Sequence, residues 1–284
     1  KRNKFDAAKV TDAEIAVCML ILEHLQRQGH ALKKDKWYCD QVAEFLAWRR
    51  AKIEELPGGE DQFKVEYPEN DVDCFEQTGR PVIKARYLKP TCVGHEHGID
   101  GHEYIIGCDT SLGLESGDPA AISVIDITTG RQAHNEKLKR SPDLLAYRLT
   151  ELHEIYNNAL VVVERNNTGI ATIRELQKQI DEDFIFRYLD RRLERKVEDG
   201  DLTIDEAMAQ AEFGLVTTAK NKPDYAIALE QAIRTGEIGL SSEEWCEEAR
   251  TVVWFDNGSW GALSGYHDDQ FMALALASFV WLKL

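Results

Sequence analysis

The sequence lacks the features that define several large classes of protein. Its most apolar run, residues 15–22, is far shorter than the ~20 residues that cross a bilayer. The first residues, 1–6, do not lead into the apolar core of a secretory signal. The six cysteines form no Cys-x-x-Cys pair and mostly have apolar neighbours, which predicts reduced core thiols. We therefore expect a protein that is neither secreted nor membrane-spanning, in a reducing cytoplasm.

Positive charge is also scarce. The chain of 284 residues has 34 basic and 50 acidic side chains, a formal net charge of −16. This balance argues against a surface coated in basic residues for nucleic acid, so any contact with DNA would be confined to a local basic patch. With 43% hydrophobic residues the chain is not disordered, and its length allows one large or two modest domains.

The pattern of apolar and charged positions changes along the chain. Residues 12–56 have helical spacing and predict two helices, the second of which stops at Pro57. An irregular segment follows and ends in the Gly-rich loop 94–101. We place the domain boundary there, which divides the chain into a helical region, 1–94, and a second domain, 95–284.

The second domain begins with three strands in quick succession, which predicts an antiparallel meander. The predicted elements are strands 104–108, 120–127 and 132–138, a helix begun by Ser141-Pro142-Asp143, a buried strand 160–163, a helix 169–180 and a strand 184–188. Apolar residues surround the last helix, 271–284, which must therefore be buried. The order β-β-β-α-β-α-β predicts an α/β fold with a mixed sheet flanked by helices.

Four acidic residues stand where an apolar strand or helix ends or begins. Asp109 ends the first strand, Glu164 follows the buried strand 160–163, and Asp268 and Asp269 open the last helix. A carboxylate in such a place loses hydration, and a bound divalent cation is one way to compensate. If the first and fourth strands are neighbours, Asp109 and Glu164 lie side by side. Oxygen ligands without a His-Cys set favour Mg²⁺ or Mn²⁺ over zinc.

Carboxylates of this kind suit phosphodiester hydrolysis. Two cations roughly 3.5–4 Å apart can activate water and stabilise the leaving oxygen. In this hypothesis Asp109 bridges both cations, Glu164 binds one, and Asp268 or Asp269 binds the other. Structural alternatives stay open for each residue: Glu164 paired with Arg165, Asp268 as a helix N-cap, and Asp269 as a first-turn acid. The joint occurrence with this element order favours the metal site.

Basic residues that could grip DNA phosphates gather late in the chain. They are Arg187, Arg191, Arg192, Arg195, Lys196, Lys220 and Lys222. Most lie in or beside the charged segment 190–210, which we expect to project as a helical or hairpin excursion. Interleaved acids leave a solvated, self-paired helix face as the alternative. No base-reading motif is present, so we expect no strong sequence preference.

Four segments resemble motifs of the large subunit of tailed-phage terminase, the DNA-packaging motor. They are residues 63–81 (FKVEYPENDVDCFEQTGRP), 104–118 (YIIGCDTSLGLESGD), 161–169 (VVVERNNTG) and 265–277 (GYHDDQFMALALA). The resemblance implies an RNase H-like, resolvase-like nuclease domain that cleaves concatemeric double-stranded viral DNA during packaging. It implies Asp109, Glu164, Asp268 and Asp269 as ligands of two Mg²⁺ or Mn²⁺ ions. Some related resolvases have a ligand Asp where this sequence has Met272, which places the role on Asp268 or Asp269.

The resemblance also implies partners and a place. These are double-stranded DNA, the portal protein and the small terminase subunit, in the host cytoplasm on the procapsid. No G-x-x-x-x-G-K-[ST] phosphate loop occurs, so we interpret residues 1–94 as a remnant of the ATPase region or its linker. Two other functions remain open: a phosphotransferase of the actin or sugar-kinase type, because residues 107–113 place Asp in a similar Gly-rich pattern, and a catalytically silent docking module.

Overall fold

The computed structural model describes residues 48–57, 59, 63, 66, 67, 80–114 and 117–283. It divides the chain into two compact units, Lys1–Thr78 and Gly79–Leu284. In the first unit residues 48–55 are helical, and the Trp48 ring lies edge-on to Phe63 and Tyr67 at centroid distances of 5.8 and 5.2 Å. This helix is the described part of the second predicted helix. The first predicted helix and most of segment 63–81 lie outside the described residues.

The second unit starts earlier than the predicted boundary at residue 95. Val82, Ile83 and Leu88 are buried in its core. Arg80–Pro81 forms strand β1, which pairs with β8 (Val252–Trp254), and β8 pairs with β9 (Trp260–Ala262) in a three-stranded sheet. The 3₁₀ turn η2 (Ala85–Tyr87) follows β1. The interpretation of residues 1–94 as an ATPase remnant stays a prediction.

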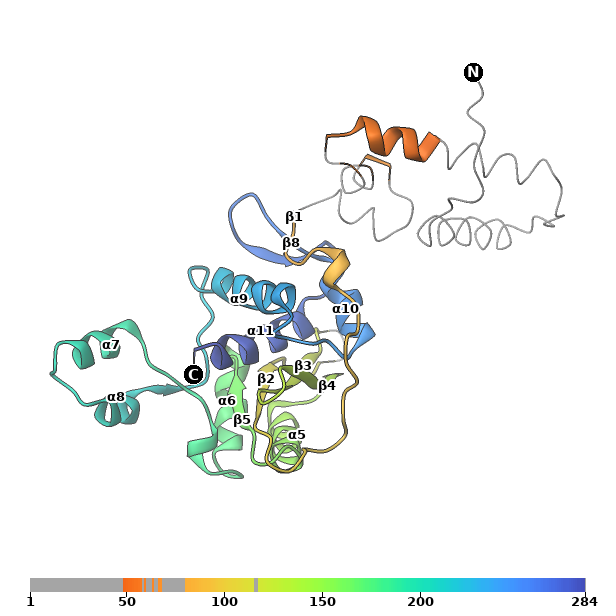
Figure 1. Ribbon diagram of the computed structural model, residues 1–284. Coiled ribbons are helices and arrows are strands. Elements are labelled where there is room, and N and C mark those ends of the chain that lie inside the picture. The colour runs from red at the N-terminus through yellow and green to blue at the C-terminus, as the bar shows by residue number, and fades with distance from the viewer. Residues whose placement is uncertain are drawn as a thin grey trace, which may run out of the picture. The chain divides into compact units, whose positions relative to one another are not determined.

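A four-stranded mixed sheet, in the order β4-β3-β2-β5, is the centre of the second unit (Figure 1). Its strands are β2 (Tyr104–Asp109), β3 (Ala120–Asp126), β4 (Arg131–Leu138) and β5 (Leu160–Val163). The first three form the predicted antiparallel meander, and β5 is parallel to β2. A parallel neighbour requires a crossover, which helix α5 (Pro142–Ile155) provides.

Helices cover both faces of this sheet because successive strand residues point to opposite sides. Ile106 of β2 belongs to the cluster shared with α5 and α6 (Asn167–Leu176). Ile105 belongs to the cluster shared with α9 (Lys222–Thr235), α10 (Glu243–Arg250) and α11 (Asp269–Trp281). The two helical layers account for the long apolar runs of β2 and β3, whereas the edge strand β4 has exposed residues.

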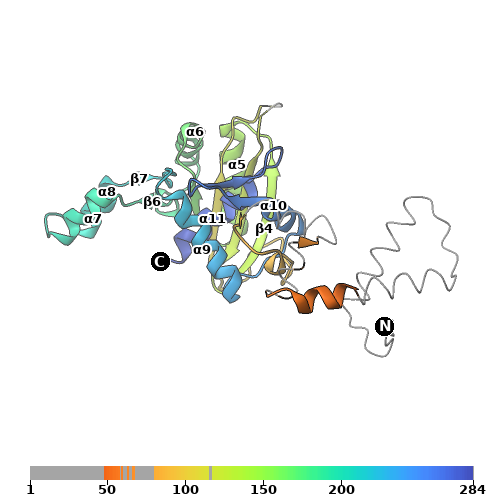
Figure 2. The same cartoon turned by 90° about the horizontal axis from the view of Figure 1, so that it is seen from above.

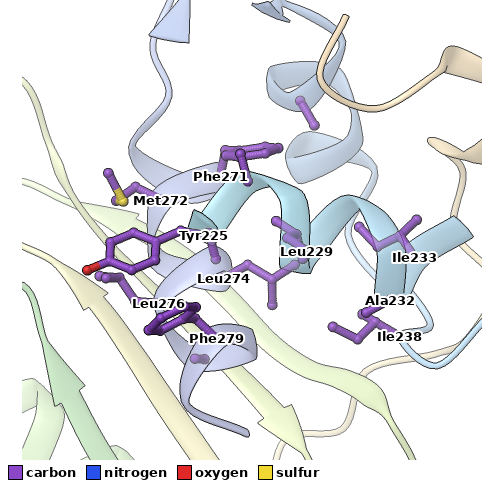
Figure 3. Packing of buried hydrophobic residues seen from close by; sticks show 14 of the residues in the cluster. Tyr225, Leu229, Ala232, Ile233, Ile238, Phe271, Met272, Leu274, Leu276 and Phe279 are labelled. Atoms are coloured by element: carbon purple, nitrogen blue, oxygen red, sulfur yellow. The ribbon is translucent and has the colours of Figure 1, made fainter. Parts of the chain in front are cut away.

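Helix α11 is buried on every side, as its sequence predicts. All residues from 270 to 280 are buried. It packs against the sheet and against α9, where the rings of Tyr225 and Phe279 meet edge to face at 4.6 Å (Figure 3). Because α11 cannot move without disrupting this core, the residues at its start have a fixed place relative to the strand ends.

The charged excursion consists of two short helices. After η3 (Glu182–Phe184), β6 (Arg187–Tyr188) pairs with β7 (Glu212–Phe213), and between them lie α7 (Arg191–Glu198) and α8 (Ile204–Gln210). Figures 1 and 2 show both helices projecting from the rest of the unit. The predicted strand 184–188 is thus β6 together with a single parallel bridge between Val161 and Ile185. The predicted order of elements is confirmed.

Two smaller expectations concern membranes and thiols. No helix among the described residues is long and apolar enough to cross a membrane. Cys92, Cys108 and Cys246, the cysteines of the described ranges, are free thiols. Burial raises the pKa of the Cys246 thiol to about 12, as expected of a core cysteine. The remaining cysteines lie outside the described residues.

Candidate metal centre

Two acidic side chains meet at one edge of the central sheet. Strands β2 and β5 are parallel neighbours, so their carboxyl ends lie at the same edge. Asp109 is the last residue of β2, and Glu164 directly follows β5, where its backbone N–H donates to the carbonyl of Cys108 at 2.9 Å. Glu164 is close enough that, after burial, it is the next largest cause of the raised pKa of Asp109. The first and fourth predicted strands are thus neighbours, which is the condition under which we expected Asp109 and Glu164 to lie side by side.

Asn166 fixes the orientation of Glu164, which is 8% exposed. Asn166 Nδ2 donates to Glu164 Oε2 at 2.9 Å, while Asn166 Oδ1 accepts from Thr110 Oγ1 and from the backbone N–H of Gly169, both at 2.8 Å. A Cβ atom at Gly169 would lie 1.8 Å from the carbonyl oxygen of Glu164, so this approach requires glycine. One amide thus joins the ends of β2 and β5 to the start of α6.

Glu164 does not pair with Arg165. The Arg165 guanidinium instead binds Glu212 Oε2 at 2.8 Å. The structural alternative that the sequence left open for Glu164 is therefore not the arrangement observed, and no ion pair with a cationic side chain of the described residues offsets its burial.

The start of α11 brings two more carboxylates. Asp268 occupies the N-cap position, yet its side chain makes no capping hydrogen bond, and its Oδ2 lies 3.6 Å from Lys222 Nζ. Asp269 begins the first turn, and its Oδ2 is a buried oxygen without a hydrogen-bond partner. His267 Nδ1 approaches that oxygen only to 3.7 Å. Asp269 thus stands in the first turn, as the structural alternative expected, whereas Asp268 holds the N-cap position without capping the helix.

The four carboxylates interact electrostatically. Burial, followed by the negative charges of Glu164, Asp269 and Asp268, raises the pKa of Asp109 well above its ordinary value. Burial, followed by the charges of Glu248 and Asp118, raises the pKa of Asp269 to about 7. Strongly raised values in one cluster are typical of functional sites.

These residues fit a divalent cation by their chemistry. All four donors are carboxylate oxygens, and one buried oxygen of Asp269 lacks a partner. Within the described ranges no three acidic, His or Cys side chains converge on one ion position. The carboxylates therefore lie near one another without forming a closed ligand set.

A cleft of about 340 Å³ gives access to the carboxylates. Asp109 and Asp269 line it together with Thr110, Thr168 and the loop that follows β2. Gly113 in this loop has φ of 69°, and a Cβ there would lie 2.3 Å from the Arg140 carbonyl carbon. The loop is thus held tightly against the residues that begin α5, and it forms one wall of the cleft.

The structure separates the seven predicted phosphate-binding residues into three groups. Lys222 reaches the carboxylates and lies 4.2 Å from the centroid of Trp260. Arg187 is bound to Glu182 at 3.1 Å and lies over the Phe213 ring. The others form no ion pair with any described residue; they are Arg191, Arg192, Arg195 and Lys196 on α7 and the exposed Lys220. Asp190 caps α7 by accepting from Leu193 N–H at 2.9 Å.

Sequence reasoning missed three polar residues beside the site. Asn166 precedes helix α6 at the position where capping residues are common, which was a usable signal. Gln270 and Glu248 are buried and hydrogen-bonded to each other at 2.9 Å. Glu248 gave no local signal because its partners at the start of α11 lie 22 and 23 residues further along the chain.

No family model and no curated protein matches the sequence. Solved structures do match. The large terminase nuclease from thermophilic phage G20c is 20% identical, and the match covers 70% of this chain and 97% of that one, with a TM-score of 0.50. The same nuclease with bound magnesium gives 20% identity, 70% and 96% coverage and a TM-score of 0.51. Its form with bound cobalt has the same identity and coverage and a TM-score of 0.50. The expected fold is confirmed: the chain has the RNase H-like α/β fold of large terminase nuclease domains.

Proposed function

We propose that this chain is the nuclease part of a phage terminase large subunit, a metal-dependent hydrolase that cleaves DNA. The observation that carries the proposal is the meeting of Asp109 and Glu164 at one sheet edge with Asp268 and Asp269 at the start of a buried helix. The shared fold supports it, and so do the nuclease structures with bound magnesium and cobalt.

We assign each of the four carboxylates a role in metal binding according to its position. When bound, two divalent cations, Mg²⁺ or Mn²⁺, would activate water and stabilise the leaving oxygen of a phosphodiester. The charges of Glu164, Asp269 and Asp268 all raise the pKa of Asp109, which indicates that it lies near all three. We therefore assign Asp109 to both cations. Glu164, oriented by Asn166, serves one of them, and Asp268 or Asp269 serves the other. Lys222, beside Asp268, adds a cation toward which a backbone phosphate can lie.

The proposed substrate is concatemeric double-stranded viral DNA without strong sequence preference, cut during genome packaging in the host cytoplasm on the procapsid. The portal protein and the small terminase subunit are the proposed partners. Because the net charge is −16, contact with DNA must be local. We assign this contact to Lys220, Lys222 and Arg187, and to the basic residues of α7, Arg191, Arg192, Arg195 and Lys196. Helix α7 projects from the rest of the unit (Figure 2).

Nicking of supercoiled plasmid in Mn²⁺ tests the proposal. We expect Asp109→Asn to reduce the rate by more than about 100-fold, since even outer-shell partners of a metal contribute about 10- to 100-fold. Glu164→Gln and Asp269→Asn should show losses of similar size. Asp100→Asn is the matched control: this exposed acid lies before β2, away from the carboxylate edge.

Two results would overturn the proposal. One is a parent protein that does not nick DNA in Mg²⁺ or Mn²⁺, which would favour a docking module. The other is an Asp109→Asn protein that nicks as fast as Asp100→Asn, which would remove these carboxylates from the reaction. Thermal unfolding of every variant establishes that lost activity is not lost folding.

A further inference from the structure

The first turn of α11 is capped from outside the helix. The first N–H groups of any helix lack intrahelical partners, and the N-cap side chain usually accepts from the second or third of them. In α11 those groups belong to Gln270 and Phe271. Both donate to Glu248 Oε1, at 2.6 and 3.1 Å. Glu248 belongs to α10 and takes the place of a capping side chain.

The natural capping residue of α11 is present but unused. Asp268 is among the residue types that cap helices best, yet it forms no capping bond. Helices α6, α7, α8 and α10 use their own N-cap side chains, which are Asn166, Asp190, Thr203 and Ser242. The N-cap side chains of α5 and α9, like Asp268, make no capping bond. What distinguishes α11 is that the two N–H groups a capping side chain would accept from are already bound to Glu248.

We propose that Glu248 is a positioning residue that caps α11 in place of Asp268 and thereby leaves the carboxylates of Asp268 and Asp269 free to bind a divalent cation. This inference rests on the proposed function. An aspartate that caps its own helix has one oxygen turned toward the backbone and held there. With Glu248 in that role, Asp268 is turned toward Lys222 at 3.6 Å, and Asp269 keeps an unpartnered oxygen.

Several contacts hold Glu248 and the first turn together. Glu248 Oε2 accepts from Gln270 Nε2 at 2.9 Å and from Lys137 Nζ at 3.2 Å. Trp245, one turn earlier on α10, donates from Nε1 to the Gln270 carbonyl at 2.9 Å and stacks on Phe271. The Gln270 side chain is also bound to Asn135 of β4. The cap is thus fixed to the sheet as well as to α10, and Lys137 offsets its charge.

Mn²⁺ binding to the metal-free protein without DNA tests the role, with free Mn²⁺ measured by electron paramagnetic resonance. Glu248→Gln keeps one oxygen at the same reach for the two N–H groups, while its amide nitrogen replaces the oxygen that accepts from Gln270 and Lys137. Because the capping oxygen is kept, we expect affinity within about fivefold of the parent. Glu248→Asp keeps the charge but is shorter by one methylene and withdraws the oxygen from the N–H groups. It should weaken Mn²⁺ binding by about 10- to 100-fold. A crystal structure of Glu248→Asp should show Asp268 accepting from Phe271 N–H.

Two controls separate this effect from lost stability. Glu247→Asp makes the same change at the exposed neighbour, and Thr203→Ala removes the cap of the remote helix α8. Both should bind Mn²⁺ like the parent, although Thr203→Ala lowers the melting temperature. If Glu248→Gln is impaired as much as Glu248→Asp, the charge matters and the capping role is wrong.

The outcome is distinguishable from failure of the proposed function. If Asp109→Asn loses Mn²⁺ binding while Glu248→Asp retains it, only the positioning role is overturned. If Asp109→Asn binds Mn²⁺ like the parent, the metal centre itself is wrong.

Discussion

Two aspartates end neighbouring strands of the same sheet, but one is surrounded by hydrogen-bond donors and the other by acidic side chains. Asp109 ends β2 and Asp126 ends β3, and because these strands are antiparallel the two residues lie at opposite edges. Asp126 is fully buried and accepts from His102 Nδ1 at 2.8 Å, from Thr129 Oγ1 at 2.8 Å and from Thr128 N–H at 3.0 Å. Burial alone would raise the pKa of Asp126, but the hydrogen bonds from His102 and Thr129 lower it.

The comparison shows that burial of an acid does not by itself indicate function. Asp126 is surrounded by donors, so its charge is satisfied by the protein and it stabilises the turn that follows β3. Asp109 is surrounded by other acids, which raise its pKa and leave the cluster in need of a proton or a cation. The nature of the neighbours distinguishes a structural carboxylate from a candidate ligand.

The largest expected difference between the two edges is in the pH dependence of the metal-free protein. The pKa of Asp269 rises from 3.8 to about 7 on folding, so between these values the folded state holds more protons than the unfolded state. Stability therefore falls as pH rises from about 4 to about 7, by roughly 1.4 kcal/mol for each pKa unit at most, and Asp109 acts in the same direction. Urea unfolding across pH should show this fall.

Asp269→Asn should flatten that fall, because the amide does not titrate. Asp126→Asn should leave it unchanged, since the pKa of Asp126 is lowered and its contribution is lost only below 3.8. A fall of equal size in Asp269→Asn would mean that other groups cause it.

A divalent cation should increase the free energy of unfolding by binding the carboxylates at the Asp109 edge, and not by binding Asp126. At pH 8 and 100 times the dissociation constant, Mn²⁺ should raise the free energy of unfolding by about 2.7 kcal/mol. Asp109→Asn should lose this gain, whereas Asp126→Asn should keep it on a lower baseline. Urea titrations with Mn²⁺ and with chelator measure the difference. A gain that persists in Asp109→Asn would place the cation elsewhere.

Much of this arrangement could be predicted from local patterns. Short apolar runs and a Ser-Pro-Asp helix start predicted the element order, and parallel crossovers made it natural for the strands ending at Asp109 and Glu164 to be neighbours. The structure makes them neighbours, which the order left as a condition. The apolar sequence of the last helix likewise predicted that Asp269 would stand at the edge of the core.

What could not be predicted depends on contacts between distant residues. Strand β1 has two residues and exists because Arg80 pairs with Trp254, which no local pattern reveals. The pair Asp268-Asp269 suggests a helix start, but the sequence does not show that Glu248, 20 residues before Asp268, accepts from the N–H groups of the first turn. Similarly, Asp126 has the same strand-end position as Asp109, and only its donors, His102 among them, show its structural role.

Replacement of each aspartate by asparagine gives the smallest expected effect but the most direct comparison. Asp126→Asn should lower the free energy of unfolding by about 1–3 kcal/mol at pH 8 without metal, because donors that faced a carboxylate then face an amide. Asp109→Asn should cause no loss, or a gain, because it removes one charge from a repelling cluster. Below pH 3.8 the cost at Asp126 should shrink as that carboxyl protonates in the parent. If urea unfolding shows equal losses of unfolding free energy for the two variants, Asp109 stabilises the fold as Asp126 does. Asp109 would then have a structural role, and its surroundings would not indicate a cation site.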